Sequence, residues 1–104
     1  MNTTKGIVIY VSATVLPENN EIFEKTLTNI VSNARQITGC LKYQWFTNPA
    51  DKYNYIIYGE FDSHENFSIY RKSEVVSMIG KYLLPLLKDK PDFKHFRTET
   101  FEQG

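Results

Sequence analysis

Apolar positions along the first half of the chain predict a strand followed by a helix. β-Branched and other apolar residues succeed one another from Ile7 to Leu16 without a breaker, which is typical of a strand, and Pro17 ends the run. Residues 21–38 place apolar side chains every three or four positions, which is the spacing of one helix face: Phe23, Leu27, Ile30, Val31, Ala34 and Ile37. Gly39 follows and is predicted to end this helix.

The middle of the chain predicts two strands joined by a tight turn. Residues 40–47 and 53–61 are rich in aromatic and β-branched residues, and the turn-forming segment 48–52 separates them. Asp62 with Glu65 three residues later resembles a capping box, which predicts that a helix begins directly after the third strand.

The last third of the chain predicts a helical region and a final strand. Apolar residues recur there at helical spacing: Phe67, Tyr70, Val75, Met78, Ile79 and Tyr82. A break is predicted within this region, either at Lys72–Ser73 or at Gly80, and residues 92–101 after Pro91 form the last strand. The order β-α-β-β-α-β predicts a single α+β domain over residues 1–104, with a ferredoxin-like fold and an antiparallel four-stranded sheet.

Both faces of the predicted sheet carry apolar residues. In the first strand Ile7 and Ile9 share one face, while Val8 and Tyr10 point the other way, and the third strand repeats the pattern with Tyr55 and Ile57 against Ile56 and Tyr58. Two helices cover only one face, so we expect a second copy of the chain to cover the other by two-fold symmetry. The alternative is a twisted sheet with a few exposed aromatic side chains.

Charge and cysteine content narrow the class of protein. Twelve acidic residues balance twelve basic ones, which argues against a nucleic-acid binder or a basic membrane-surface helix. The apolar run at residues 7–11 is too short for a signal-peptide core or a membrane span. Cys40 is the only cysteine, which excludes an internal disulfide and fits a cytoplasmic protein.

Several short motifs resemble those of the antibiotic-biosynthesis monooxygenase family. They are Gly39-Cys40-Leu41 with Tyr43, the Asn48-Pro49 turn, the group Tyr58, Glu60 and Phe61, and the spacing from Phe67 to Ser73. The resemblance implies a dimeric α+β barrel, formed by a homodimer. It also implies a quinol-monooxygenase-like reaction on a small aromatic or quinol substrate, with no metal, flavin or other cofactor.

The chain departs from the family pattern at the second helix. Tyr70 stands where the family often has a histidine, and residues 74–76 occupy the place where a further histidine commonly follows. No family histidine therefore transfers to this sequence. This loss supports an alternative function, a non-catalytic small-ligand-binding or stress-associated dimer on the same scaffold.

Three residues are the candidates for catalysis. Tyr70 replaces the family histidine, and Glu60 stands at the family's acidic position, where it either orients a base or forms a structural ion pair. His64 is predicted in the first helical turn, where the helix dipole favours a neutral, proton-accepting imidazole, and its alternative role is that of a solvated residue at the helix start. His95 is the other histidine and is assigned to the dimer interface, and no paired carboxylates accompany either histidine at metal-ligand spacing.

Four aromatic residues are the candidates for substrate binding, because aromatic walls with a few polar groups are typical of small-molecule sites. They are Trp45, Tyr43, Tyr55 and Tyr58, and each has the alternative role of a core aromatic. A third function class, a single-stranded RNA binder, shares the same element order. Its signature requires a basic residue before the Gly, which Tyr58-Gly-Glu-Phe lacks, and Glu60 would repel phosphate.

Overall fold

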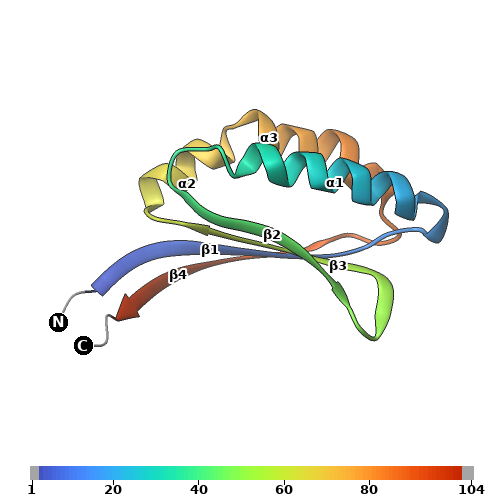
Figure 1. Cartoon of the computed structure of the whole chain (residues 1–104), viewed down its shortest axis with the longest axis horizontal. Helices are drawn as coiled ribbons and strands as arrows, with labels where there is room; N and C mark the ends of the chain where they lie inside the picture. Colours follow the sequence, from blue (N-terminus) through green and yellow to red (C-terminus); the bar gives the residue numbers. More distant parts are fainter. Residues whose placement is uncertain (1–2, 102–104) are drawn as a thin grey trace.

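A four-stranded antiparallel sheet forms one layer of the molecule and the helices form the other (Figure 1). The computed structural model describes residues 3–101. The strands are β1 (Thr3–Thr14), β2 (Cys40–Asn48), β3 (Asp51–Phe61) and β4 (Asp92–Phe101). They lie in the order β2-β3-β1-β4, so the predicted ferredoxin-like α+β fold is confirmed.

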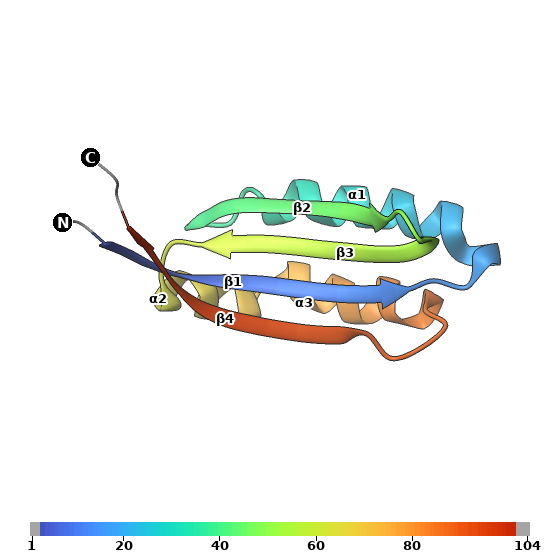
Figure 2. The same cartoon turned by 90° about the horizontal axis from the view of Figure 1, so that it is seen from below.

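The helical layer divides between the two halves of the sheet. One part is α1 (Asn20–Ala34), which follows the single turn η1 (Pro17–Asn19). The other consists of α2 (His64–Arg71), α3 (Glu74–Met78), the π-helical turn η2 (Ile79–Leu83) and the 3-10 turn η3 (Leu84–Leu86). Seen through the sheet, α1 lies behind β2 and β3, whereas α2 and α3 lie behind β1 and β4 (Figure 2).

The first helix ends four residues earlier than the sequence pattern predicted. α1 ends at Ala34, and the next turns tighten, because the N–H of Gln36 bonds to the carbonyl of Asn33 and that of Ile37 to Ala34. Gly39 then reverses the chain with φ of 84°. An added Cβ there would lie 2.4 Å from the Asn66 side chain, so both its conformation and its surroundings require glycine.

The cap of α2 lies one residue later than predicted. Ser63, not Asp62, is the N-cap, and its Oγ accepts a hydrogen bond of 3.1 Å from the N–H of Asn66. Asp62 instead accepts a hydrogen bond of 2.8 Å from the Asn66 side chain. Of the two predicted breaks, the chain uses Lys72–Ser73 as the junction between α2 and α3, whereas Gly80 lies inside η2.

Strand lengths also differ from the sequence prediction. β1 begins at Thr3 rather than Ile7, and β3 begins at Asp51 rather than Tyr53, so only Pro49 and Ala50 connect β2 to β3. Pairing with neighbouring strands extends these elements through residues that carry no apolar signal of their own.

The core lies between the sheet and the helices. β1 and β3 present alternate residues to it, and α1 adds its apolar face. The buried side chains in these three elements are Ile7, Ile9, Val11, Ala13, Tyr55, Ile57, Phe61, Phe23, Leu27, Ile30, Val31 and Ala34. This is the face on which the predicted alternation is purely apolar.

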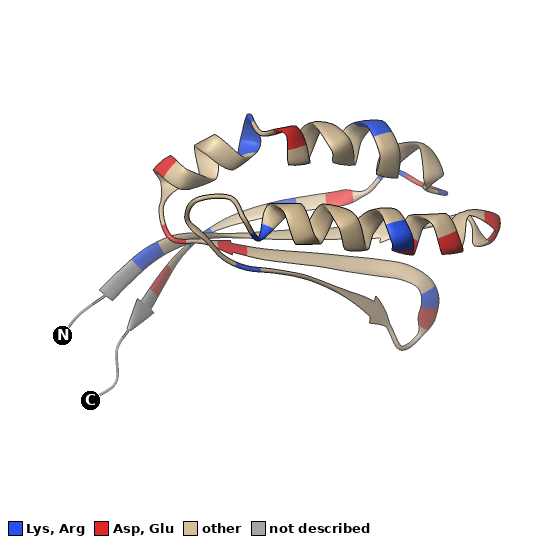
Figure 3. Ribbon diagram, turned by 45° about the horizontal axis from the view of Figure 1, so that its top comes forward, with Lys and Arg blue, Asp and Glu red and all other residues tan. Residues whose placement is uncertain are grey.

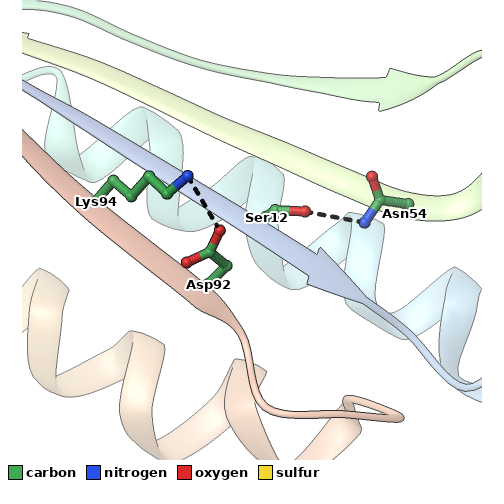
Figure 4. Close-up of polar contacts among 4 residues, drawn as sticks. All are labelled: Ser12, Asn54, Asp92 and Lys94. Carbon is green, nitrogen blue, oxygen red and sulfur yellow. Dashed lines mark hydrogen bonds and ion pairs between the residues drawn. The ribbon is translucent and has the colours of Figure 1, made fainter.

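The opposite face of the sheet is mixed in character, and no element within residues 3–101 covers it (Figure 1). Phe46 and Phe96 remain about half exposed there, at 50% and 49%. Polar contacts interrupt the apolar surface, because Asn54 donates to Ser12 at 3.2 Å and Lys94 lies 3.7 Å from Asp92 (Figure 4). The sequence predicted apolar residues on both faces of the sheet. On the face that points away from the helices, this prediction holds only in part.

Candidate functional site

A cavity of about 350 Å³ lies between the sheet and the second helical half of the molecule. Its floor comes from the helix-facing side of the sheet, and its roof from α2, α3, η2 and η3. The lining residues are Ile9, Val11, Ala13, Phe23, Tyr43, Ile57, Tyr70, Arg71, Val76, Ile79, Gly80, Leu83, Leu84, Leu87, Pro91, Phe93 and His95. The lining is mostly apolar with a few polar groups, which is the usual composition of a small-molecule site.

Two buried tyrosines supply hydroxyl groups to this cavity. Tyr43 and Tyr70 are only 1% and 5% exposed, and their hydroxyl oxygens lie 2.7 Å apart. One hydroxyl donates to the other, and within residues 3–101 neither has a further hydrogen-bond partner. Two hydroxyls carry two protons and this bond uses one, so one O–H is left to donate to a ligand.

Local structure fixes Tyr43 on β2. The Arg35 side chain, just past the end of α1, donates through Nε to the Tyr43 carbonyl at 2.9 Å. Gly59 pairs with Tyr43 on the neighbouring strand, and a Cβ at Gly59 would approach the Tyr43 ring to 2.9 Å. The glycine therefore lets the Tyr43 ring lie across β3.

The end of α2 holds Tyr70 in place. Its ring contacts those of Phe61 and Phe67, with centroids 4.7 Å and 6.0 Å away. The Ser73 hydroxyl donates to the Tyr70 carbonyl at 2.6 Å, directly at the junction that ends α2. The helix junction at Lys72–Ser73, one of the two breaks that the sequence predicted, therefore directly follows the residue whose hydroxyl meets Tyr43.

Both hydroxyls of the pair stay protonated at neutral pH. Burial, followed by the neighbouring Tyr70, raises the pKa of Tyr43 far above its ordinary value. Burial raises the pKa of Tyr70 to about 12, although its hydrogen bond with Tyr43 works in the opposite direction. The pair can therefore donate one hydrogen bond to an oxygen atom in the cavity, but neither member is a base at neutral pH.

A histidine that the sequence prediction assigned to the interface belongs to this cavity instead. His95 lies opposite Ile9 in the β1–β4 register, so it faces the helices rather than the open face. Its ring meets that of Phe67 edge-on at 5.1 Å. His95 is largely exposed, but partial burial first, and the positive charge of Arg71 second, lower its pKa below the ordinary 6.5. His95 is therefore neutral at pH 7 and able to accept a proton.

Arg71 also lines the cavity, and the sequence pattern did not predict this role for it. Its guanidinium carbon lies 5.9 Å from the centre of the Phe67 ring, and the residue is otherwise exposed.

The alternation of residues 93, 95 and 97 in β4 was visible in the sequence. Which face those residues share became known only from the pairing of β4 with β1.

Trp45 and Tyr55, two predicted substrate-binding residues, lie outside the cavity. The Tyr55 ring stacks on Phe23 at 4.9 Å, and its hydroxyl lies 2.7 Å from Asn20 Oδ1 and 2.8 Å from Glu24 Oε2. The Trp45 ring packs 5.6 Å from Tyr55. Both residues form the contact of β2 and β3 with α1, so their placement is that of core aromatics.

Three further predicted site residues lie away from the cavity. Tyr58 and Glu60 alternate with the buried residues of β3 and so face away from the helices, where the Tyr58 hydroxyl donates to Glu60 at 2.6 Å. That bond, then partial burial, raises the pKa of Tyr58. His64 is exposed at the start of α2. Of the seven predicted site residues, the structure brings only Tyr43 and Tyr70 together at the cavity.

Among the described residues, no group of three or more His, Cys, Asp or Glu side chains is arranged to hold a metal ion. Within residues 3–101, no helix combines the length and the apolar character needed to cross a bilayer.

A family model described as "Antibiotic biosynthesis monooxygenase" matches residues 6–99, which is nearly the whole chain. The chain belongs to the antibiotic biosynthesis monooxygenase family. The match includes every strand that contributes to the cavity, together with Tyr43, Tyr70, Arg71 and His95. No curated protein matches this member of the family at a significant level.

Solved structures share the fold of this family member. A crystal structure of an antibiotic biosynthesis monooxygenase is 16% identical, with a TM-score of 0.79 over 86% of this chain and 95% of that chain. A conserved protein from Methanosarcina mazei Go1 is 14% identical, with a TM-score of 0.83 over 89% and 92%. Protein SO0527 from Shewanella oneidensis is 14% identical, with a TM-score of 0.81 over 94% of both chains. At these identities the likeness concerns the fold alone.

Proposed function

We propose that the cavity binds a small aromatic or quinol substrate and that the protein oxygenates it with molecular oxygen, using no cofactor. The observation that carries the proposal is the buried Tyr43–Tyr70 pair, which keeps one O–H proton for a ligand in an apolar cavity that His95 also lines. A cavity of about 350 Å³ is large enough for a flat ring system of two fused rings. Membership of the monooxygenase family supports this type of reaction.

The proposed reaction begins with proton transfer from the substrate. Neutral His95 accepts the hydroxyl proton of a bound quinol, and the resulting anion is electron-rich enough to pass one electron to dioxygen. The ring radical and superoxide then combine, forming a carbon–oxygen bond at a ring carbon. The proton held by His95 returns to the peroxide oxygen.

The atoms and electrons of this reaction balance without an external reductant. The oxygen–oxygen bond breaks, one oxygen atom stays on the ring in place of a C–H hydrogen, and the other leaves as water. A 1,4-naphthalenediol thus becomes a 2-hydroxy-1,4-naphthoquinone, and the ring supplies all four electrons that reduce dioxygen. The spare hydroxyl proton of the tyrosine pair bonds to the substrate oxygen on which negative charge develops.

Oxygen-electrode assays with menadiol-type and polyphenol substrates test this proposal. His95→Gln should lower kcat/KM by about 10²-fold because it removes the base. Tyr70→Phe should also lower it by about 10²-fold because it removes the hydroxyl pair. Trp45→Phe and His64→Gln are matched controls outside the cavity, and both should keep the natural rate.

Two results would count against the proposal. An unchanged rate in His95→Gln would show that His95 is not the base of the reaction. Oxygen uptake no faster than spontaneous oxidation of every substrate, together with tight binding of aromatic ligands, would favour the non-catalytic ligand-binding function. Tyr70 in place of the common family histidine is the feature that keeps this second function in view.

The proposed assembly is a homodimer in which two open sheet faces pack together. Phe46 and Phe96 are about half exposed on that face, and such apolar surface is usually covered. Light scattering should show a dimer for the natural chain and a monomer for the double variant Phe46→Asp/Phe96→Asp. Ile22→Asp, an equally exposed apolar position on α1, is the control and should stay dimeric. A monomeric natural chain would refute the assembly.

A further inference from the structure

Arg71 is the only permanently charged residue among the described residues that line the cavity. No Asp or Glu lines it, and His95 is neutral at pH 7 because its pKa is lowered. The rest of the lining is apolar apart from the two tyrosine hydroxyls. A single positive charge at the edge of an apolar cavity favours ligands that carry one negative charge.

No acidic side chain within residues 3–101 neutralises the Arg71 charge. Across the part of the chain that the structure describes, no carboxylate lies within 4.0 Å of it, whereas Lys5, Lys25 and Lys94 each have an acidic partner. Glu74 follows only three residues later and forms no such pair. Basic positions at the junction of α2 and α3 stand out on the helical layer in Figure 3.

Among the described residues, Arg71 makes an aromatic contact and no ion pair. Its guanidinium lies 5.9 Å from the centre of the Phe67 ring, and Phe67 in turn contacts both Tyr70 and His95. This chain of contacts places the charge beside the proposed reacting groups. The planar guanidinium keeps its N–H donors available, and their geometry matches the two oxygens of a carboxylate.

We propose that the cavity selects aromatic substrates that carry a carboxylate or a similar acidic group, and that Arg71 binds this group at the edge of the cavity. The inference names the substrate class of the proposed oxygenase and so rests on that proposed function. Arg71 is a specificity-determining residue in this scheme, because the acidic group it binds takes no part in the electron transfer.

A pair of fluorescent probes tests the charge preference without any reaction. 8-Anilinonaphthalene-1-sulfonate and N-phenyl-1-naphthylamine share the same ring system, and only the first carries a negative charge. The natural protein should bind the sulfonate more tightly, and Arg71→Gln should raise its Kd about tenfold while leaving the Kd of the neutral probe unchanged. Lys72→Gln removes the neighbouring charge outside the cavity and should change neither value.

Two further variants keep the test decisive. Val76→Trp fills part of the cavity and should weaken both probes equally, which shows that both bind there rather than on the open sheet face. Arg71→Lys keeps the charge without the planar donor fork and should retain part of the preference even if Arg71→Gln fails to fold. In the natural protein, added salt should weaken only the sulfonate. Equal affinity for the two probes, or equal loss in Arg71→Gln and Lys72→Gln, would overturn the inference.

Turnover of a matched substrate pair separates this inference from the proposed function. 1,4-Dihydroxy-2-naphthoate and 1,4-naphthalenediol differ only in the carboxylate. A higher kcat/KM for the acid that Arg71→Gln abolishes supports both proposals. Oxidation of the neutral diol alone, with no probe preference, overturns the Arg71 assignment and leaves the oxygenase intact. If the protein prefers the charged probe but consumes no oxygen, the result supports an acidic ligand bound by Arg71 and refutes the oxygenase reaction.

Discussion

Tyr43 and Tyr55 lie on neighbouring strands and face the same helical layer, yet their hydroxyl groups have opposite surroundings. The Tyr55 hydroxyl lies within 2.8 Å of two acceptors, Asn20 and Glu24, so its proton is fully used inside the protein. Within residues 3–101, the Tyr43 hydroxyl bonds only to the hydroxyl of Tyr70, and this pair leaves one hydroxyl proton without an acceptor. The hydrogen-bond partners thus distinguish Tyr55, a structural tyrosine, from Tyr43, which belongs to a pair that can donate a hydrogen bond to a ligand.

The two surroundings follow from how the helices cover the sheet. α1 is a continuous helix of 15 residues, and its packing against β2 and β3 encloses Tyr55, Phe23 and the partly buried Trp45. The second helical half is interrupted at Lys72–Ser73 and widened in η2, so it covers β1 and β4 less completely. The cavity lies under this interrupted half because short, misaligned helical pieces cannot fill the space that one straight helix fills.

The largest expected effect is a loss of stability on truncation of a buried side chain beneath α1. Tyr55→Ala should lower the free energy of unfolding by about 3–5 kcal/mol, because it removes a fully buried ring from a close-packed site. Tyr53→Ala, two residues earlier on the same strand and half-exposed, should lower it by under ~1 kcal/mol. Urea denaturation measures both values. A loss below about 1 kcal/mol for Tyr55→Ala would mean that this half is not close-packed.

An intermediate effect concerns the hydroxyl pair. Tyr43→Phe should cost about 1–3 kcal/mol, because it leaves the buried Tyr70 hydroxyl without its partner. Tyr43→Phe/Tyr70→Phe removes both hydroxyls and should cost less than either single change, since no buried polar group is then left unpaired. Chemical denaturation of the three variants gives the coupling. Simple addition of the two single losses would show that the hydroxyls do not depend on each other.

The smallest expected effect is a shift in pH dependence. Because burial and Arg71 lower the pKa of His95 below 6.5, kcat/KM should rise with pH through that lowered pKa and be level at pH 7. Arg71→Gln removes the second cause, so the midpoint should move upward but stay below 6.5, since burial remains. The pH–rate profile and NMR titration of the imidazole both report this midpoint. If Arg71→Gln leaves the midpoint unchanged, the charge of Arg71 does not influence the pKa of His95.

The lowered pKa of His95 also makes the free energy of unfolding depend on pH. The folded protein binds fewer protons at His95 than the unfolded chain does at pH values below 6.5. This contribution to stability is therefore present above pH 6.5 and is lost as the pH falls through the lowered folded pKa.

The sequence by itself determined the order of the elements, because hydrophobic periodicity and glycine or proline breaks are local signals. They also offered Lys72–Ser73 as one of two possible helix breaks, and the structure uses that one. The aromatic character of the second strand pointed to Tyr43 and the family resemblance pointed to Tyr70, as separate candidates on different elements. The local signals misplaced the end of α1 and the cap of α2, because tightened turns after Ala34 and the Ser63 side chain decide those ends by their own hydrogen bonds.

Only the tertiary structure decided which candidates form a site. Strand alternation shows which residues share a face but not which face meets the helices, so His95 could be assigned only through its register with Ile9. The contact between the Tyr43 and Tyr70 hydroxyls joins residues 27 positions apart in the sequence. The physical reason is that a cavity belongs to the gap between two layers. Its walls come from segments whose relative positions are fixed by packing and by strand pairing over long sequence distances.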